Sequence, residues 1–434
     1  MNHRAVGFRF TTRAGHPTFV DLPWERALSE WDTDRLVAPI RGISRHVVRF
    51  VSYGPDVYAL KELPDPLAGR EYRLLRALDE RSVPVVEAVG IAAGRTTGGG
   101  EPLDDVLITR HLPYSLPYRS LFAQASLADL WDSLLDALAE LLARTHLAGF
   151  FWGDCSLSNT LFRRDAGALS AWLVDAETGE RHDRLSDGQR HHDLEIAELN
   201  VAGELLDIRA QVAGKGQLTG LAADDPRYDP AAVAEDLRRR YDGLWHELTT
   251  VEVFGAGEEW RVEDRVRRLN ELGFDVDELE LVDDPADPEG HVLRLTTRVV
   301  EPGHHRRRLL QLTGLDVQEN QARRLLNDIL AYRAWLERRS GVPVDEQVGA
   351  LRWMVEVFEP TLSAVPQELR SKLEGAELFH EILEHRWFLS EERGEDVGTD
   401  VAVADYLETE LPRRPDERTV LVAPVTGEVP AVPE

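Results

Sequence analysis

The sequence is poor in cysteine, in lysine and in long apolar runs. Its single cysteine, Cys155, excludes an internal disulfide and favours a reducing compartment. No apolar run approaches the roughly 18 residues of a membrane span. The N-terminal stretch MNHRAVGFRF lacks the apolar core of a signal peptide. Together these absences predict a cytoplasmic protein without a transmembrane segment.

Charge and length restrict the possible functions further. The net charge of −28 argues against general binding to nucleic acids or anionic membranes, since both need a basic surface. The length of 434 residues predicts two or three domains. Local basic patches remain possible.

Lysine is rare, because only three of the 50 basic residues are lysines. Arginine serves elsewhere, so a retained lysine marks a position suited to a compact point charge rather than a planar guanidinium. Lys215 lies in a Gly-flanked loop and Lys372 in a predicted polar helix, where any cation would serve. Lys61 lies within a predicted strand and is the lysine with a candidate role. Its alternative interpretation is a solvated strand residue.

A polar segment over residues 151–180 contains Asp154, Asn159 and Asp175 between short apolar runs. A carboxylate that takes a nucleophile's proton, with an amide and a carboxylate that hold Mg²⁺, is the set used in phosphoryl transfer. Alternatively, the Asp and Asn are ordinary turn residues. The pattern predicts a hairpin that gathers the three side chains at one end of a cleft. Its expected strands and turn are 161–162, 172–174 and 165–167.

Hydrophobic patterning predicts the elements before and after this segment. An N-terminal extension over residues 1–35 is expected to include a short helix that Asp21 caps and that reaches Trp31. The expected strands are 36–40, 45–51, 57–63, 85–92 and 105–110. The expected helices are 66–81, 127–147, 192–210 and 230–251, with a loop at 214–229.

The character of the sequence changes after about residue 253. The pattern there predicts mainly helices with two strands, and a Pro- and Val-rich tail that is extended or disordered. The expected helices are 258–272, 303–313, 316–340, 344–357, 366–386 and 401–410, and the expected strands are 276–281 and 291–299.

Over about 36–250 the sequence resembles the protein-kinase-like fold. The stretches that support the likeness are VYALKEL from Val57, GREYRLLRAL with Glu71, WGDCSLSN from Trp152 and LVDAE from Leu173. The run is similar to the lipopolysaccharide-kinase branch. More narrowly, it resembles an uncharacterised bacterial family in which such a lobe precedes a C-terminal domain of unknown function.

The resemblance implies an α+β fold. A two-lobed domain over 36–250, with a small lobe to about 110 and a large lobe from about 111, would bind ATP and Mg²⁺ between its lobes. A mostly helical domain with a small β element would follow over 251–411, and a flexible tail over 412–434.

The resemblance also implies roles for residues on the nucleotide side. Lys61 would grip the phosphates and pair with Glu71. Gly42 would lie in the phosphate loop. The hinge at 108–113, which includes Arg110 and Leu112, would contact the base.

Further roles concern the chemistry. The resemblance implies that Asp154 is the catalytic base, working with Lys61, and that Asn159 and Asp175 bind the metal. Asp193, expected to open the next helix, would anchor the backbone of the catalytic loop from below.

Several residues depart from the usual pattern. Trp152 stands where kinases carry His, and Ala176-Glu177 replaces Phe-Gly after the metal-binding Asp. The stretch RGISRH, which contains Gly42, has one glycine where protein kinases use three. No long activation segment follows Asp175. These departures favour an atypical or small-molecule-type kinase over a regulated protein kinase.

The sequence thus predicts a phosphotransferase that uses ATP–Mg²⁺ on an unidentified hydroxyl of a small molecule, saccharide or protein. A second interpretation is a nucleotide-binding pseudokinase scaffold that recruits a protein partner through the C-terminal domain. A third is transfer of AMP on the same fold. The single-glycine loop and Ala176-Glu177 support the scaffold, whereas the retention of the whole set Lys61, Asp154, Asn159 and Asp175 argues against it. The sequence does not separate AMP transfer from phosphoryl transfer.

Overall fold

The protein is described by a computed structural model that covers most of the chain. Gly42, most of the expected helix 258–272 and the chain beyond residue 421 lie outside the described residues. The described residues are 7–39, 46–118, 127–215, 229–250, 252–255, 267–269, 272, 274, 278–283, 292–298, 303–414, 416–418 and 420–421.

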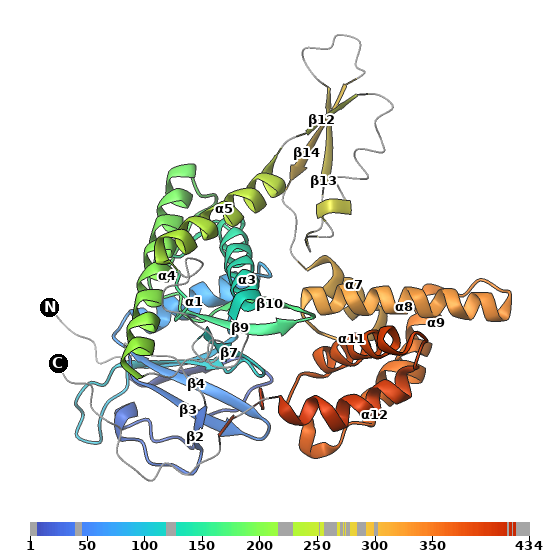
Figure 1. The fold of residues 1–434 in the computed structure, drawn as a ribbon. Helices are drawn as coiled ribbons and strands as arrows, with labels where there is room; N and C mark the ends of the chain where they lie inside the picture. Colours follow the sequence, from blue (N-terminus) through green and yellow to red (C-terminus); the bar gives the residue numbers. More distant parts are fainter. Residues whose placement is uncertain are drawn as a thin grey trace.

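A seven-stranded antiparallel sheet forms the small lobe (Figure 1). Strand β4 pairs with β3 on one side and β6 on the other, so Lys61 lies in the interior of the sheet. The strands, in spatial order, are β1 (Arg9–Thr12), β5 (Ala88–Ala93), β6 (Asp105–Arg110), β4 (Asp56–Leu63), β3 (Val48–Tyr53), β2 (Leu36–Pro39) and β15 (Val420–Leu421).

One helix, α1 (Leu67–Asp79), connects β4 to β5 and contacts the sheet. It buries Ala68, Glu71, Leu75 and Leu78, whose spacing places them on one face of a helix. Glu71 is therefore an acidic residue on an otherwise apolar face. A buried carboxylate in that position needs a partner.

The N-terminal stretch is part of the small lobe, which differs from the expected extension. Strand β1 pairs with β5, and Phe19, Trp24 and Trp31 pack into a core under the sheet. The expected helix ending at Trp31 is wrong, because only a 3-10 turn, η1 (Leu28–Glu30), forms. The indole N–H groups of Trp24 and Trp31 bond to the carbonyls of Phe19 and Arg26, which fixes a non-helical path.

The large lobe surrounds the predicted hairpin, which is confirmed as β9 and β10 with a tight turn at Ala166-Gly167. Helix α4 begins at Asp187 rather than at residue 192, because Ser186 and Gln189 form a capping pair at its start. The elements are α3 (Leu127–Leu147), β7 (Leu116–Pro117), β8 (Phe150–Phe151), β9 (Thr160–Asp165), β10 (Ala168–Leu173), β11 (Glu180–Arg181), α4 (Asp187–Lys215) and α5 (Pro230–Thr249).

The C-terminal part is mostly helical, as expected, with a three-stranded sheet that projects from the end of α5 (Figure 1). Trp353, Phe358 and Phe379 form the aromatic centre of the helical core. The elements are β12 (Glu252–Gly255), β13 (Glu278–Asp283), β14 (Val292–Arg298), α7 (His304–Thr313), α8 (Glu319–Ser340), α9 (Glu346–Trp353), the π-helical turn η3 (Met354–Phe358), α10 (Glu359–Ser363), η4 (Gln367–Leu369), α11 (Gly375–Arg393), α12 (Thr399–Thr409) and η5 (Leu411–Arg413).

The expected helix over 366–386 is confirmed only in its second half, since α11 runs from Gly375 to Arg393. The carbonyls of Ser371 and Lys372 instead accept hydrogen bonds from the backbone N–H groups of Arg418 and Glu417. The start of the expected flexible tail thus packs against the protein, and β15 extends the small-lobe sheet by pairing with β2.

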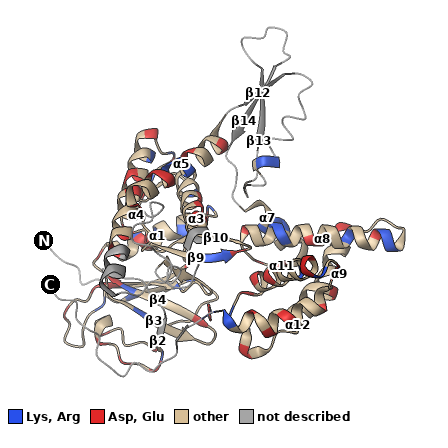
Figure 2. Ribbon diagram, in the orientation of Figure 1, with Lys and Arg blue, Asp and Glu red and all other residues tan. Residues whose placement is uncertain are grey.

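Acidic and basic residues are interleaved along the helices in Figure 2. Arg240, for example, contacts Asp136 and Asp236, and Arg238 contacts Glu198. Among the described residues, no helix combines the length and the apolar composition needed to cross a membrane.

Replacing Phe19 with alanine should destabilise the protein by about 3–5 kcal/mol, because the ring is fully buried in the small-lobe core. Urea unfolding would measure the change. Phe8→Ala is the control, since that ring is 51% exposed and should lose under about 1 kcal/mol. Equal effects would show that the N-terminal stretch is not part of the core.

Candidate active site

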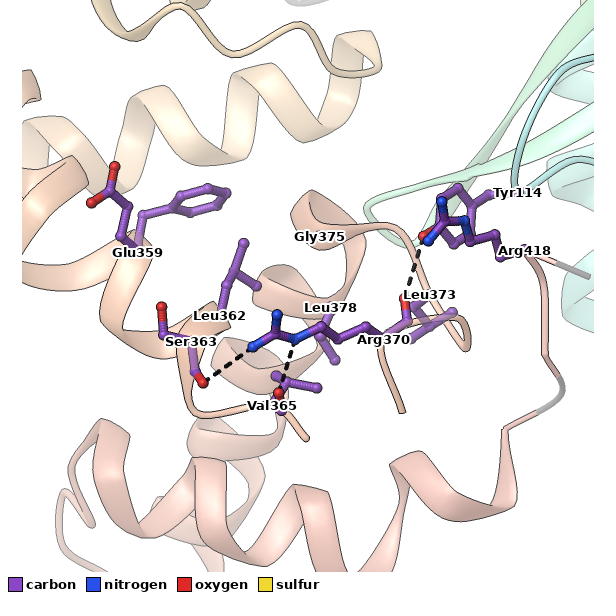
Figure 3. Close-up of a pocket in the computed structure, with 11 residues that line it drawn as sticks. Tyr114, Glu359, Leu362, Ser363, Val365, Arg370, Leu373, Gly375, Leu378 and Arg418 are labelled. Atoms are coloured by element: carbon purple, nitrogen blue, oxygen red, sulfur yellow. Dashed lines mark hydrogen bonds between the residues drawn. The ribbon is translucent and has the colours of Figure 1, made fainter. Parts of the chain in front are cut away.

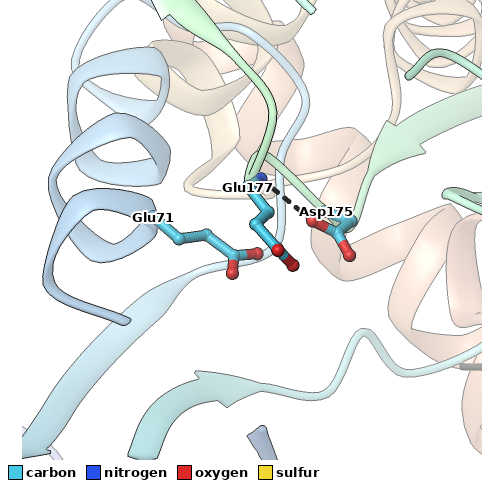
Figure 4. Close-up of side chains that lie close together, drawn as sticks. All are labelled: Glu71, Asp175 and Glu177. Carbon is cyan, nitrogen blue, oxygen red and sulfur yellow. Dashed lines mark hydrogen bonds between the residues drawn. The ribbon is translucent and has the colours of Figure 1, made fainter. Parts of the chain in front are cut away.

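Lys61 stands at the centre of a cluster of three carboxylates from two separate parts of the chain. Its Nζ lies 3.1 Å from Glu71 Oε2, 2.6 Å from Asp175 Oδ2 and 3.4 Å from Glu177 Oε2. Glu71 comes from α1, while Asp175 and Glu177 come from the segment after β10, and the three carboxylates converge in Figure 4. The structure therefore brings together Lys61, Glu71 and Asp175, which are 114 residues apart at their extremes.

The electrostatics of the cluster are dominated by burial. Burial, and then the charge of Asp175, raises the pKa of Glu71 to about 7, although Lys61 opposes this. Burial alone would lower the pKa of Lys61, but Glu71 and Asp175 raise it above its ordinary value. One ammonium faces three carboxylates, so the cluster has more negative charge than Lys61 neutralises. That is the electrostatic condition for attracting a further cation.

The oxygen atoms of this cluster fit a hard divalent cation. Carboxylate oxygens of Glu71, Asp175 and Glu177 all lie within 4.8 Å of one another. Mg²⁺ prefers oxygen ligands and commonly uses one or two carboxylates with substrate phosphates. The donor set therefore suits Mg²⁺ held by Asp175 and Glu177, with Glu71 paired to Lys61.

A second group of polar side chains surrounds Asp154. Asn159 Nδ2 donates to Asp154 Oδ2 over 3.0 Å and to the Asp154 carbonyl over 2.9 Å. Asn200 Nδ2, from α4, donates to Asp154 Oδ1 over 3.2 Å. Because the side-chain nitrogen of Asn159 is bonded to Asp154, only the side-chain oxygen of Asn159 is left to bind a cation. The predicted residues therefore form two neighbouring groups rather than one.

The two groups are joined through the backbone. Val174 N–H donates to the Asn159 carbonyl over 3.0 Å, which extends the hairpin ladder by one bond. The indole N–H of Trp152 donates to the Asp175 carbonyl over 2.8 Å. Trp152 is fully buried, so this residue, which departs from the usual pattern, ties the loop of Asp154 to the segment of Asp175.

Asp193 holds the loop from below, as the resemblance implied. Its carboxylate accepts the backbone N–H groups of Trp152, over 2.6 Å, and Gly153, over 2.8 Å. His146 Nε2, from α3, lies 3.1 Å from the same carboxylate, and its Nδ1 lies 2.7 Å from the Tyr241 hydroxyl of α5. Asp193 lies within α4 and does not open it, so it is not a helix cap.

Other predicted residues lie elsewhere. The Arg110 side chain is exposed and paired with Asp56 over 2.6 Å, so the structure does not bring it to the cluster. Leu112 is buried beyond the end of β6, and its carbonyl accepts from Ser115. Gly42 lies outside the described residues. Cys155 is fully buried and burial raises the pKa of its thiol, so it packs in the core and is not set up as a reactive thiol.

Some contacting residues were not predicted. His46 Nε2, at the end of the stretch containing Gly42, lies 2.9 Å from Glu177 Oε2. Glu204 accepts the N–H groups of Leu157 and Ser158 over 2.8 and 2.9 Å. Asp193, Asn200 and Glu204 are spaced by seven and four residues, which places them on one face of α4. A polar stripe on a buried helix was the signal that could have found them.

Two family models match successive parts of the chain. Residues 52–204 match the model of the "Lipopolysaccharide kinase (Kdo/WaaP) family", and 243–411 match "Domain of unknown function (DUF4032)". The first match spans the carboxylate cluster around Lys61 and the polar group around Asp154, while His46 and Tyr241 lie outside it. The chain has a kinase-like fold followed by a DUF4032 domain.

Two solved structures show similarity to part of the chain. One is "WaaP in complex with acyl carrier protein", at 16% identity and a TM-score of 0.32, covering 55% of this chain and 99% of that one. The other is "Crystal structure of BubR1 kinase domain", at 13% identity and a TM-score of 0.30, covering 57% and 89%. The search of curated proteins gave no match.

Trp152→Phe should destabilise the kinase-like domain by about 1–3 kcal/mol, because the carbonyl of Asp175 loses its donor inside the protein. Chemical unfolding would measure it. Trp172→Phe is the matched control: its indole is only half-buried and its bond to Ser170 is 3.3 Å long. An equal loss in both variants would contradict a special role for the Trp152 bond.

Acid should destabilise the protein through His111, whose pKa burial lowers to about 4. The folded chain leaves this ring neutral while the unfolded chain protonates it, so stability is lost as the pH falls from about 6.5 to 4. His111→Phe should reduce that loss by about 1–2 kcal/mol, while substitution of the exposed His192 should not. Unfolding curves at several pH values test this, and parallel curves for His111→Phe and wild type would refute it.

Proposed function

We propose that the protein is a kinase-like phosphotransferase that uses ATP–Mg²⁺ to phosphorylate a hydroxyl group on an acceptor. The observation that supports this most is the contact of Lys61 with Glu71 and Asp175 beside the Asp154–Asn159 pair. The family match over the same residues supports the phosphotransferase class. The use of ATP and Mg²⁺ and the presence of a hydroxyl on the acceptor are parts of this proposal.

In this proposal the basic residue would bind the phosphates, and the acidic and amide side chains would bind the metal ion. Lys61, oriented by Glu71, would neutralise charge on the nucleotide phosphates. Asp175, Glu177 and the amide oxygen of Asn159 would hold Mg²⁺, which when bound neutralises phosphate charge in phosphoryl transfer. Placing fixed charges where negative charge develops is the main source of catalysis in such sites.

Asp154 would receive the proton of the acceptor hydroxyl. Both of its carboxylate oxygens accept amide N–H groups, from Asn159 and Asn200, which fixes the plane of the carboxylate. Asp193 and Glu204 hold the backbone on either side of it. A base fixed in this way would orient the hydroxyl for attack with little reorganisation.

We also propose a cytoplasmic location, which the single buried thiol of Cys155 supports, since a reducing compartment keeps it free.

Asp175→Ala should abolish stabilisation of the protein by ATP–Mg²⁺ and lower phosphoryl transfer at least about 100-fold, because a metal ligand and a partner of Lys61 are lost together. Thermal unfolding with and without ATP–Mg²⁺ measures the first effect. Transfer of γ-labelled phosphate to panels of small-molecule, saccharide and protein acceptors measures the second. Asp183→Ala, an exposed aspartate nearby, should behave as wild type.

The same assays distinguish the alternatives. Wild-type protein that ATP–Mg²⁺ does not stabilise would exclude the nucleotide site. Transfer of label from the α-phosphate would replace phosphoryl transfer by AMP transfer. Stabilisation without transfer of either label to any acceptor would favour the pseudokinase scaffold.

A further inference from the structure

The tip of the hairpin that bears the site is buried in the C-terminal domain. Asp165, at the end of β9, is 2% exposed. Its carboxylate accepts the backbone N–H groups of Asn320, over 3.1 Å, and Gln321, over 2.7 Å, and also the Asn320 side-chain amide. Asp165 thus bonds the first turn of α8, where N–H groups lack partners within the helix. The kinase-like domain supplies a cap to a helix of the DUF4032 domain.

A second buried carboxylate, Glu377, also binds the turn. Glu377 Oε2, from α11, accepts the backbone N–H of Ala166 over 2.8 Å and the Gln321 side-chain amide over 2.9 Å. The same amide donates to the Arg164 carbonyl over 3.1 Å. The polar backbone of the hairpin turn is therefore bonded by residues of α8 and α11.

Further contacts fix the sides of the hairpin. Arg163 pairs with Glu374, and Arg164 with the buried Glu417, each over 2.6 Å. Ser170 Oγ, on β10, donates to Gln318 over 3.0 Å. Both strands thus contact the C-terminal domain.

The hairpin links this contact rigidly to the site. Its six cross-strand pairs run without a bulge from Ala168 opposite Asp165 to Leu173 opposite Thr160. Asn159 precedes the first residue of β9, and Asp175 follows β10 by two residues. Six strand residues span about 20 Å, so the tip and the base are ends of one short, paired element.

A second contact between the domains is made by Tyr114, after β6. Its hydroxyl donates a hydrogen bond of 3.3 Å to the Arg370 carbonyl. The cavity of about 360 Å³ that Tyr114 helps to line lies mostly in the C-terminal domain, because its other lining residues come from between 358 and 418 (Figure 3). The hairpin tip, with several bonds of 2.6 to 3.1 Å, is bonded more tightly than this single contact.

We propose that the C-terminal domain positions the metal- and base-side residues of the site by holding the hairpin tip, with Asp165 and Glu377 as positioning residues. The proposal rests on the proposed function, because it assigns the domain a part in that site. Released from these bonds, the tip would fray, and Asn159 and Asp175 would lose their fixed separation. The domain of unknown function is then a structural part of the catalytic centre.

Asp165→Ala in the full-length chain tests this against Asp345→Ala. Asp345 caps α9 by accepting the N–H groups of Gln347 and Val348, so its loss removes a helix cap in the same domain without touching the hairpin. Hydrogen exchange of the β9 and β10 amides reports the hairpin directly. Calorimetric titration with ADP–Mg²⁺ reports the site. We expect Asp165→Ala to speed hairpin exchange and weaken nucleotide binding about fivefold or more, and Asp345→Ala to do neither.

Glu377→Gln is the milder second variant and should give the same pattern to a smaller extent if Asp165→Ala does not fold. Hairpin exchange equal to that of Asp345→Ala in the folded variants would overturn the proposal. Faster exchange with unchanged nucleotide affinity would overturn it as well. If wild-type protein binds no nucleotide, the proposed function fails, and the exchange data alone decide whether the domain holds the hairpin.

Discussion

The enclosure of the largely buried Lys61 side chain by carboxylates is the constraint on which the arrangement of the lobes depends. A charge removed from water is tolerated only when partners surround it closely, and removing one partner of a buried pair is strongly destabilising. The partners of Lys61 come from α1 and from the segment after β10. Strand β4, the helix beside it and the large lobe must therefore meet at one point. The small-lobe sheet fixes one side of that point and the hairpin fixes the other.

Helix α4 provides the second layer of this arrangement. One of its faces presents Asp193, Asn200 and Glu204 to the loop between Trp152 and Ser158. The loop has little regular structure of its own, so its backbone N–H groups need side-chain acceptors. His146 and Tyr241 in turn connect α4 to α3 and α5. The loop that contains Asp154 is thus held by three helices. Asp175, in contrast, contacts Lys61 of the small-lobe sheet.

The sequence predicted the local patterns well and the long-range contacts poorly. Apolar patterning placed β4, β6 and α3 close to their observed bounds, because each is a regular element with a periodic apolar face. It also predicted the hairpin, whose strands are longer than expected. The rarity of lysine in the sequence pointed to Lys61. The spacing of polar residues in the segment 151–180 pointed to Asp154, Asn159 and Asp175. The helix expected before Trp31 failed because indole bonds from distant positions overrode local propensity. Asn200 and Glu204 were not predicted, because a polar residue on a helix can be given a role only once the loop that it contacts is known. The expected turn at 165–167 includes Asp165, which in the structure ends β9. No neighbouring residue in the sequence indicates that Asp165 also caps α8, some 155 residues later.

The pairing of β15 with β2 has a consequence for how the chain comes to be folded. During synthesis the small-lobe sheet can assemble once β6 has emerged, but one edge of it, β2, receives its neighbour only after residue 421 has been made. An uncovered strand edge is a template for pairing with other chains. Until Val420 and Leu421 arrive, this edge of the sheet is therefore available for pairing with other chains.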